Sequence, residues 1–127
     1  MTAAELRIGN WVNINGWDCD VAEISTNQIH ISNGIEPYLL EYEVEPIPLT
    51  KEWLVRFGFE PHSGIYFRTL NYSAYIAIGN DGSCGLYNSL SDYNRGNSFN
   101  QMKQIDYVHQ LQNLYFALTG QELELKP

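Results

Sequence analysis

The chain has 127 residues, a hydrophobic fraction of 44% and a formal net charge of −8, which suit one domain or two small subdomains and exclude two large domains. The acidity reflects a shortage of cations, since only seven Lys and Arg accompany 15 Asp and Glu. So few cations disfavour direct binding to nucleic acid or to an anionic membrane surface. No apolar run approaches the roughly 18 residues of a membrane span, and no apolar signal core follows the N-terminus, so we expect a cytoplasmic protein.

The first 49 residues contain a pattern of short strands separated by turns. Apolar and polar residues alternate over residues 10–14, and the partner strand is predicted over 17–24. Asn15-Gly16 between them is typical of a tight type I′ hairpin turn. A third strand is predicted over residues 28–32. The pattern therefore predicts an SH3-like β-meander or barrel for residues 1–49, an analogy of fold that carries no function by itself.

Two prolines, Pro46 and Pro48, mark a boundary because proline cannot donate a ladder hydrogen bond. Thr50 then fits a helix N-cap before a short helix over residues 51–57. An antiparallel meander and a C-terminal helix follow. We therefore predict an α+β fold in which residues 50–127 form a second subdomain that shares one core with the first. The later elements are predicted at residues 64–70, 73–78 and 84–88 (strands), 89–100 (loop) and 105–118 (helix).

Two segments, residues 47–59 (IPLTKEWLVRFGF) and 107–120 (YVHQLQNLYFALTG), resemble signatures of a family of small proteins from phages, prophages and mobile elements of anaerobic gut bacteria. Residues 6–10 and 85–88 also fit, so the resemblance covers most of the chain. It implies no catalytic or binding residue. The phage setting implies an accessory protein that acts on host factors in the host cytoplasm, such as a counter-defence protein that sequesters a nucleotide-derived immune signal.

Residues 89–100 form the longest stretch without a clear periodicity, and loops of this length are often functional. Within it, Arg95 lies between Tyr93-Asn94 and Gly96-Asn97. A guanidinium there could bind a phosphate or carboxylate bidentately, with an exposed arginine as the simpler alternative. Arg68, in the predicted meander, is the natural second cation. For a small nucleotide-type ligand, the predicted binding residues are Arg95, Tyr93, Arg68, Tyr87, Asn88 and Asn97.

The alternative function is a non-enzymatic adaptor or inhibitor that binds a host protein. Glu41, Glu43 and Glu45 alternate, so a strand over them would place all three on one face, although a solvated sheet edge is the simpler interpretation. The C-terminal helix offers a second surface, because its polar side lacks charge and would suit polar protein groups or a partner. That side comprises His109, Gln110, Gln112 and Asn113.

Motifs of common enzymes are absent, including G-x-S-x-G, H-E-x-x-H, the P-loop and G-x-G-x-x-G. We therefore predict no catalytic residue, metal ligand or cofactor, and a hydrolase ranks third among the functions. Cys19 and Cys84 lie far apart without a C-x-x-C pair, which favours two free thiols over a disulfide. A homodimer is also considered, because a small chain encloses a deep pocket more easily at a subunit interface.

Overall fold

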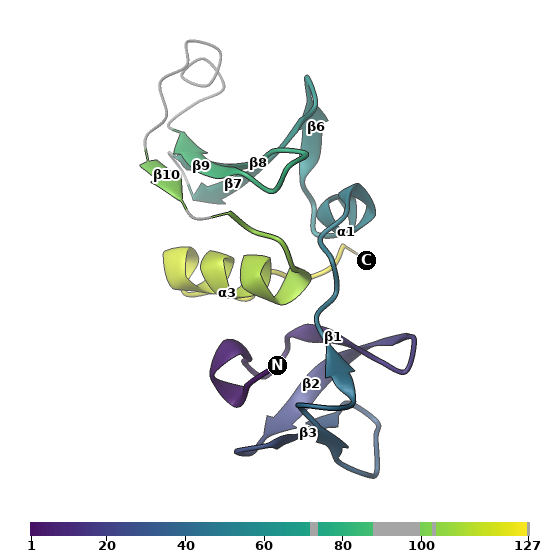
Figure 1. The fold of residues 1–127 in the computed structure, drawn as a ribbon. Helices are drawn as coiled ribbons and strands as arrows, with labels where there is room; N and C mark the ends of the chain where they lie inside the picture. Colours follow the sequence, from purple (N-terminus) through teal and green to yellow (C-terminus); the bar gives the residue numbers. More distant parts are fainter. Residues whose placement is uncertain (72–73, 88–99, 103, 127) are drawn as a thin grey trace. The chain divides into compact units, whose positions relative to one another are not determined.

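The computed structural model describes residues 1–71, 74–87, 100–102 and 104–126, and the chain divides into two compact units (Figure 1). Unit 1 comprises Met1–Pro48 and Tyr107–Leu114, and unit 2 comprises Leu49–Asp106 and Tyr115–Pro127. The C-terminal helix α3 (Val108–Thr119) contributes to both units. The described residues form two antiparallel sheets with helices, which confirms the predicted α+β class.

Unit 1 contains a five-stranded antiparallel sheet in the order β4-β3-β2-β1-β5. The predicted hairpin of β1 and β2 is confirmed, since its turn residues Asn15 and Gly16 adopt φ angles of 52° and 89°, both positive as a type I′ turn requires. The edge strands β4 and β5 are not paired with each other, so the sheet does not close into a barrel. The elements are η1 (Ala3–Glu5), β1 (Trp11–Ile14), β2 (Trp17–Ile24), β3 (Gln28–Ile31), β4 (Tyr38–Leu39) and β5 (Val44–Glu45).

The core of unit 1 lies on the inward face of this sheet. Strand alternation places Val12 and Ile14 on that face, and both are buried. Leu6 joins them from the segment after η1. The buried cluster contains Leu6, Val12, Ile14, Val21, Ile29, Leu40 and Val44.

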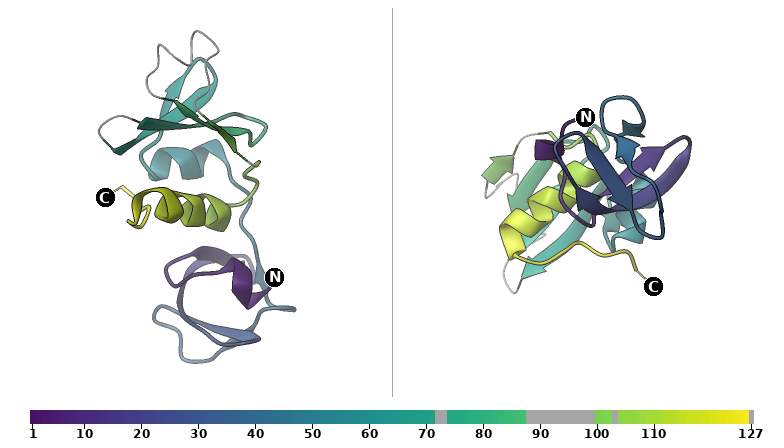
Figure 2. Two further views of the ribbon diagram at one scale, coloured as in Figure 1. Left: turned by 90° about the vertical axis from the view of Figure 1, so that its left-hand side faces the viewer. Right: turned by 90° about the horizontal axis from the view of Figure 1, so that it is seen from below.

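Unit 2 contains a second five-stranded antiparallel sheet in the order β10-β9-β8-β7-β6. Helix α1 begins after Thr50, whose hydroxyl accepts a hydrogen bond from the Trp53 N–H at 3.4 Å, which confirms the predicted cap. Helix α1 lies against one face of this sheet, and no described helix of unit 2 lies against the other (Figures 1 and 2). The elements are α1 (Lys51–Arg56), β6 (Glu60–His62), β7 (Ile65–Asn71), β8 (Ala74–Ile78), β9 (Cys84–Tyr87) and β10 (Asn100–Met102).

The register of the second sheet defines its two faces. Phe67, Ala77 and Gly85 lie directly opposite one another on β7, β8 and β9, so they share one face. Thr69, Tyr75 and Tyr87 form a second such row on the same face, two residues along each strand. We call these six residues the outer face. The opposite face is covered by α1, because Leu54 of that helix lines a hollow together with Tyr66 and Ile78.

Further features constrain the chemistry. Within the described ranges, no helix has the length and apolar character needed to cross a bilayer. Both cysteines are free thiols, as the sequence favours. Burial raises the pKa of Cys84 to about 11, so its thiol is protonated and unreactive near neutral pH.

Candidate functional site around Arg68

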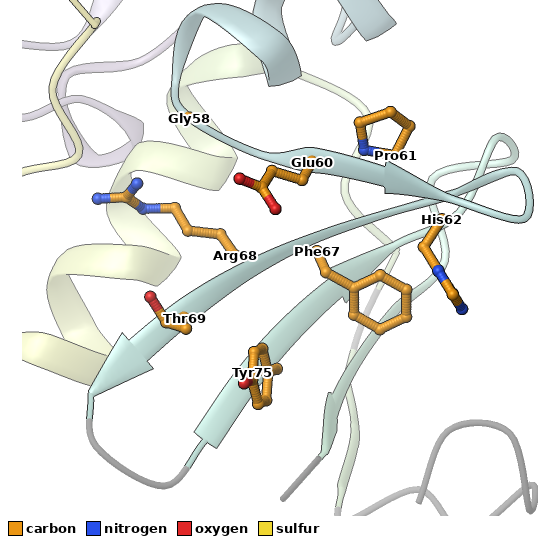
Figure 3. Close-up of a pocket in the computed structure, with 8 residues that line it drawn as sticks. All are labelled: Gly58, Glu60, Pro61, His62, Phe67, Arg68, Thr69 and Tyr75. Atoms are coloured by element: carbon orange, nitrogen blue, oxygen red, sulfur yellow. The ribbon is translucent and has the colours of Figure 1, made fainter. Parts of the chain in front are cut away.

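A hollow of about 230 Å³ lies in unit 2 where the short strand β6 runs beside β7. Because β6 pairs with β7 only at residues 65–67, the hollow opens beside the part of β7 that β6 leaves unpaired. Figure 3 shows Arg68, Glu60 and Thr69 toward one side of it, and Phe67 with His62 toward the other. We call this site the Arg68 hollow; it is lined by Gly58, Glu60, Pro61, His62, Phe67, Arg68, Thr69 and Tyr75.

Arg68 is held in place by Tyr115 on α3. Its Nη2 donates a hydrogen bond to the Tyr115 hydroxyl at 3.3 Å, and its Cζ lies 5.3 Å from the centre of the Tyr115 ring. The Nε–H of Arg68 is buried and has no hydrogen-bond partner among the described residues. Because this atom has almost no accessible surface, a ligand meets Arg68 at the partly exposed remainder of its side chain.

Gly58 gives the guanidinium its space. Its φ of +89° suits glycine, and a Cβ at this position would lie 2.7 Å from Nη1 of Arg68 and 3.8 Å from Cδ of Lys126. The Lys126 N–H donates to the Arg56 carbonyl at 2.7 Å, which ties the C-terminal segment to the end of α1. The segments that meet around Gly58 therefore carry three cationic residues, Arg56, Arg68 and Lys126.

The two units differ in net charge, because unit 2 holds most of the cations. Unit 1 holds eight acidic residues and one cation, Arg7, whereas unit 2 holds seven acidic residues and six cations. Glu60 is the acidic residue of the Arg68 hollow, but among the described residues no carboxylate pairs with Arg68 within 4.0 Å. The positive charge of Arg68 is thus available to an anion.

The other side of the hollow is aromatic. The His62 and Phe67 rings meet edge to face, with centroids 5.9 Å apart and planes at 73°. Phe67 is only 6% exposed, whereas Tyr75 is half-buried at the wall of the hollow. This side offers ring faces and edges rather than charge.

The predicted binding residues are divided by the structure. Arg68 lines the hollow just described. Tyr87 lines a neighbouring hollow of about 200 Å³ and lies directly opposite Tyr75 in the sheet. The remaining predicted residues, Arg95, Tyr93, Asn88 and Asn97, lie outside the described residues.

Sequence reasoning missed His62, Phe67 and Tyr75 as site residues. The β6 strand carries Pro61 and has no apolar alternation, so the edge strand that brings His62 beside β7 was not predicted. Tyr75 was within a predicted strand, but its position opposite Tyr87 follows from a register that alternation alone does not set. Alternation in the sequence could have predicted which of these residues share a face of the sheet, but it could not have predicted the hollow.

The predicted acidic strand face is wrong. Glu41 and Glu43 lie in the turn between β4 and β5, and only Glu45 belongs to a strand. Alternation applies only where the backbone is extended, and here the chain reverses direction instead. Glu45 lies opposite Asn13, which lies opposite Asp18 and donates a hydrogen bond to its carboxylate at 3.1 Å.

The polar side of α3 is occupied by unit 1 itself, not presented to a partner. The Gln112 side chain accepts from the Trp11 N–H at 2.8 Å and donates to the Gly9 carbonyl at 3.1 Å. Asn113 donates to the Glu5 carbonyl at 2.9 Å, and its oxygen accepts from the Asn10 amide at 2.9 Å. Of the two alternatives that the sequence left open, contact with polar groups of the protein is confirmed at these two residues, which satisfy backbone and side-chain groups of unit 1.

His109 is buried beside this network, with 3% of its side chain exposed. Burial lowers its pKa below the ordinary 6.5, and the Glu5 carboxylate, whose Oε1 lies 4.0 Å from Nε2, only partly opposes that shift. The ring stacks on Tyr107 at a centroid distance of 6.0 Å. We infer a neutral, structural histidine at pH 7.

Comparison with protein-family models, with curated proteins and with solved structures finds no match. Within the described part of the chain, no three His, Cys, Asp or Glu side chains gather closely enough to hold a metal ion. The chemistry of the site therefore rests on the geometry around Arg68.

Proposed function

We propose that this chain is a non-enzymatic binding protein and that its unit 2 holds a small anionic ligand in the Arg68 hollow. The observation that carries the proposal is the Arg68 guanidinium, which Tyr115 holds at the hollow and which pairs with no carboxylate of the described residues within 4.0 Å. A phosphate or carboxylate supplies the missing negative charge. Guanidinium groups favour such anions because two N–H groups can bind two oxygens at once.

The rest of the hollow supports a ligand with hydroxyl groups near its charge. Glu60 and Thr69 line the same side as Arg68, and a carboxylate and a hydroxyl both accept hydrogen bonds from a sugar. The volume, about 230 Å³, is below the roughly 300–1,000 Å³ of sites for drug-sized molecules. The hollow thus suits a small ligand or the charged part of a larger one.

In its specific form, the proposal is that a phage-encoded protein sequesters a nucleotide-derived signal in the host cytoplasm. The resemblance of residues 47–59 and 107–120 to phage and prophage proteins supports this setting. Sequestration requires that the ligand be released unchanged. An SH3-like arrangement of residues 1–49 and a homodimer are proposed as well, but neither supplies a binding group for the ligand.

The test begins with small molecules released by heat from the purified protein and identified by mass spectrometry. Intact ligand supports sequestration, product from an added substrate indicates a hydrolase, and capture of a host protein without a small molecule favours the adaptor or inhibitor. A thermal-shift screen of AMP, ADP-ribose and cyclic dinucleotides follows, because a ligand at 100 times its Kd stabilises the native state by about 2.7 kcal/mol.

Variants then locate the site. Arg68→Ala should weaken binding of the nucleotide found in the screen by roughly thirtyfold or more, because a charged contact at a desolvated site is lost. Arg68→Lys should restore part of the affinity, since an ammonium cannot reproduce the planar fork. Arg56→Ala is the matched control, as its guanidinium lies over Trp53 at 4.3 Å and does not line the hollow. Equal affinity in wild type and Arg68→Ala would overturn the proposal.

A further inference from the structure

The outer face of the second sheet has an unusual distribution of side-chain sizes. The row of directly opposed residues that contains Phe67 continues with Ala77 and Gly85, so its one large side chain lies on β7. The adjacent row places Tyr75 beside Tyr87, and directly opposed residues in an antiparallel pair have Cβ atoms about 4.5–5.5 Å apart. Large rings therefore border two positions with almost no side chain.

Gly85 allows Tyr87 to lie close to the sheet. A Cβ at Gly85 would lie 3.1 Å from Cε2 and 3.2 Å from the hydroxyl oxygen of Tyr87, closer than ordinary van der Waals contact. The Tyr87 ring thus packs over the glycine backbone instead of projecting away from it. Such packing restricts the orientation of the ring before any ligand binds, which lowers the entropic cost of stacking.

Residues of the outer face line two hollows, and Arg68 lines one of them from the opposite face, because it alternates with Phe67 and Thr69 along β7. Phe67 and Tyr75 line the Arg68 hollow, and their cross-strand neighbours Ala77 and Tyr87 line the hollow of about 200 Å³ beside it. A ligand bound to Arg68 therefore reaches this aromatic surface past the edge of β7 that β6 leaves unpaired, where the hollow opens. No described helix of unit 2 covers this face (Figure 1).

We propose that the ligand of the Arg68 hollow is an aromatic anion, in which a planar heteroaromatic ring stacks at Tyr75 while the anionic group binds Arg68. This inference rests on the proposed function and deepens it by assigning the ring subsite. Aromatic side chains bind bases by their faces with little dependence on base identity, so Tyr75 determines the class of ligand rather than the base. Nucleoside monophosphates have both groups.

The test separates the two parts of the ligand. Isothermal titration compares AMP with ribose 5-phosphate, which has the same phosphate and sugar but no ring. AMP should bind at least fivefold more tightly to the wild-type protein, because removing a base-stacking ring typically costs roughly fivefold to a hundredfold. Tyr75→Ala should abolish that difference and leave ribose 5-phosphate binding unchanged, whereas Tyr75→Phe should retain the difference.

Tyr42→Ala is the matched control, since Tyr42 is 78% exposed in unit 1. Melting temperatures of all variants establish that each is folded, and Tyr75→Leu, which also removes the ring, replaces Tyr75→Ala if that variant does not fold. Equal affinities of AMP and ribose 5-phosphate for the wild type would overturn the ring subsite while leaving the anion site intact. An Arg68→Ala variant that binds both probes as the wild type does would overturn the proposed function, and so would a wild type that binds neither.

Discussion

Units 1 and 2 each contain a five-stranded antiparallel sheet, but they use their polar side chains differently. In unit 1, both ends of the Gln112 amide bind backbone groups, and Asn113 links Glu5 and Asn10. In unit 2, Arg68 is fixed by Tyr115 at the hollow and has no carboxylate partner among the described residues. Paired buried groups stabilise a fold, whereas a fixed cation without a counter-charge is the kind of group that we propose for an anionic ligand.

Unit 1 also contains a buried side-chain nitrogen without a partner among the described residues. That nitrogen is Nδ1 of His109. Because burial lowers the pKa of His109, its ring is neutral near pH 7, so the unpaired nitrogen carries no charge. His109 is also not among the residues that line the Arg68 hollow. The polar groups of unit 1 are therefore structural, whereas Arg68 is the group that we propose for binding.

The largest expected effect is on the core of unit 1. Leu111 is fully buried on α3, so Leu111→Ala should lower the free energy of unfolding by roughly 2–5 kcal/mol through lost contacts and a cavity. Leu118, half-buried on the same helix, provides the control, and Leu118→Ala should cost less. Urea denaturation measures both. A loss below about 1 kcal/mol for Leu111→Ala would mean that the buried side of α3 is misassigned.

The next effect concerns the polar network. Gln112→Ala leaves the Trp11 N–H and the Gly9 carbonyl without their side-chain partner, which should cost about 1–3 kcal/mol of stability. Gln121→Ala, at an exposed position, should change stability by less than about 0.5 kcal/mol. Ligand affinity should be unchanged in both variants. If Gln112→Ala weakened binding of AMP without loss of stability, the assignment of unit 1 to structure would be wrong.

A pair of glycines compares the units directly. Gly9 in unit 1 and Gly58 in unit 2 have φ angles of +96° and +89°, so an alanine at either position should cost roughly 1–2 kcal/mol of stability through backbone strain. Only Gly58→Ala places a Cβ against Arg68, since nothing lies within 4 Å of the Cβ position at Gly9. Calorimetric titration should show weaker anion binding for Gly58→Ala alone. Similar losses of affinity in both variants would contradict the role of Gly58.

The smallest effect is a dependence of stability on pH. The pKa of His109 lies below 6.5 in the folded chain, so near and below that pH the unfolded chain binds more protons and stability falls as the pH falls. Below about 4.5 the lowered pKa of Glu5, caused chiefly by its bond from the Thr2 N–H, adds a loss of the same sign. Unfolding curves between pH 7 and 5 should show a smaller slope for His109→Gln than for wild type. His30→Gln, at a more exposed position, is the control, and an unchanged slope in His109→Gln would refute a buried neutral histidine.

Local sequence signals predicted the local structure well. Asn15-Gly16 predicted its hairpin, and Thr50 predicted the start of α1, because both signals act through a few neighbouring backbone groups. The alternating glutamates at residues 41, 43 and 45 failed, since alternation has meaning only in a strand and the chain turns there. Contacts between residues far apart in the sequence could not be predicted without the tertiary structure. Gln112 sits on a polar helix side in the sequence, and only the tertiary structure shows that Gly9 and Trp11 use it.

The candidate site was predicted in part for the same reason. Scarcity of cations drew attention to Arg68, and the structure places it at a hollow. Its aromatic neighbours could not be predicted, because they depend on the pairing of β6 with β7 and on the register between Tyr75 and Tyr87. Arg95, the other predicted cation, lies outside the described residues and stays a prediction.

The most direct test of the account is an NMR titration of the ¹⁵N-labelled protein with AMP. Amide shifts map the bound region without assuming which residues matter. The account predicts perturbations at residues 58–62, 67–69 and 75–77 of unit 2, with those of β1–β5 in unit 1 unchanged, and predicts that Arg68→Ala greatly reduces them. Perturbations centred on the strands of unit 1, or a pattern in unit 2 that persists undiminished in Arg68→Ala, would contradict it.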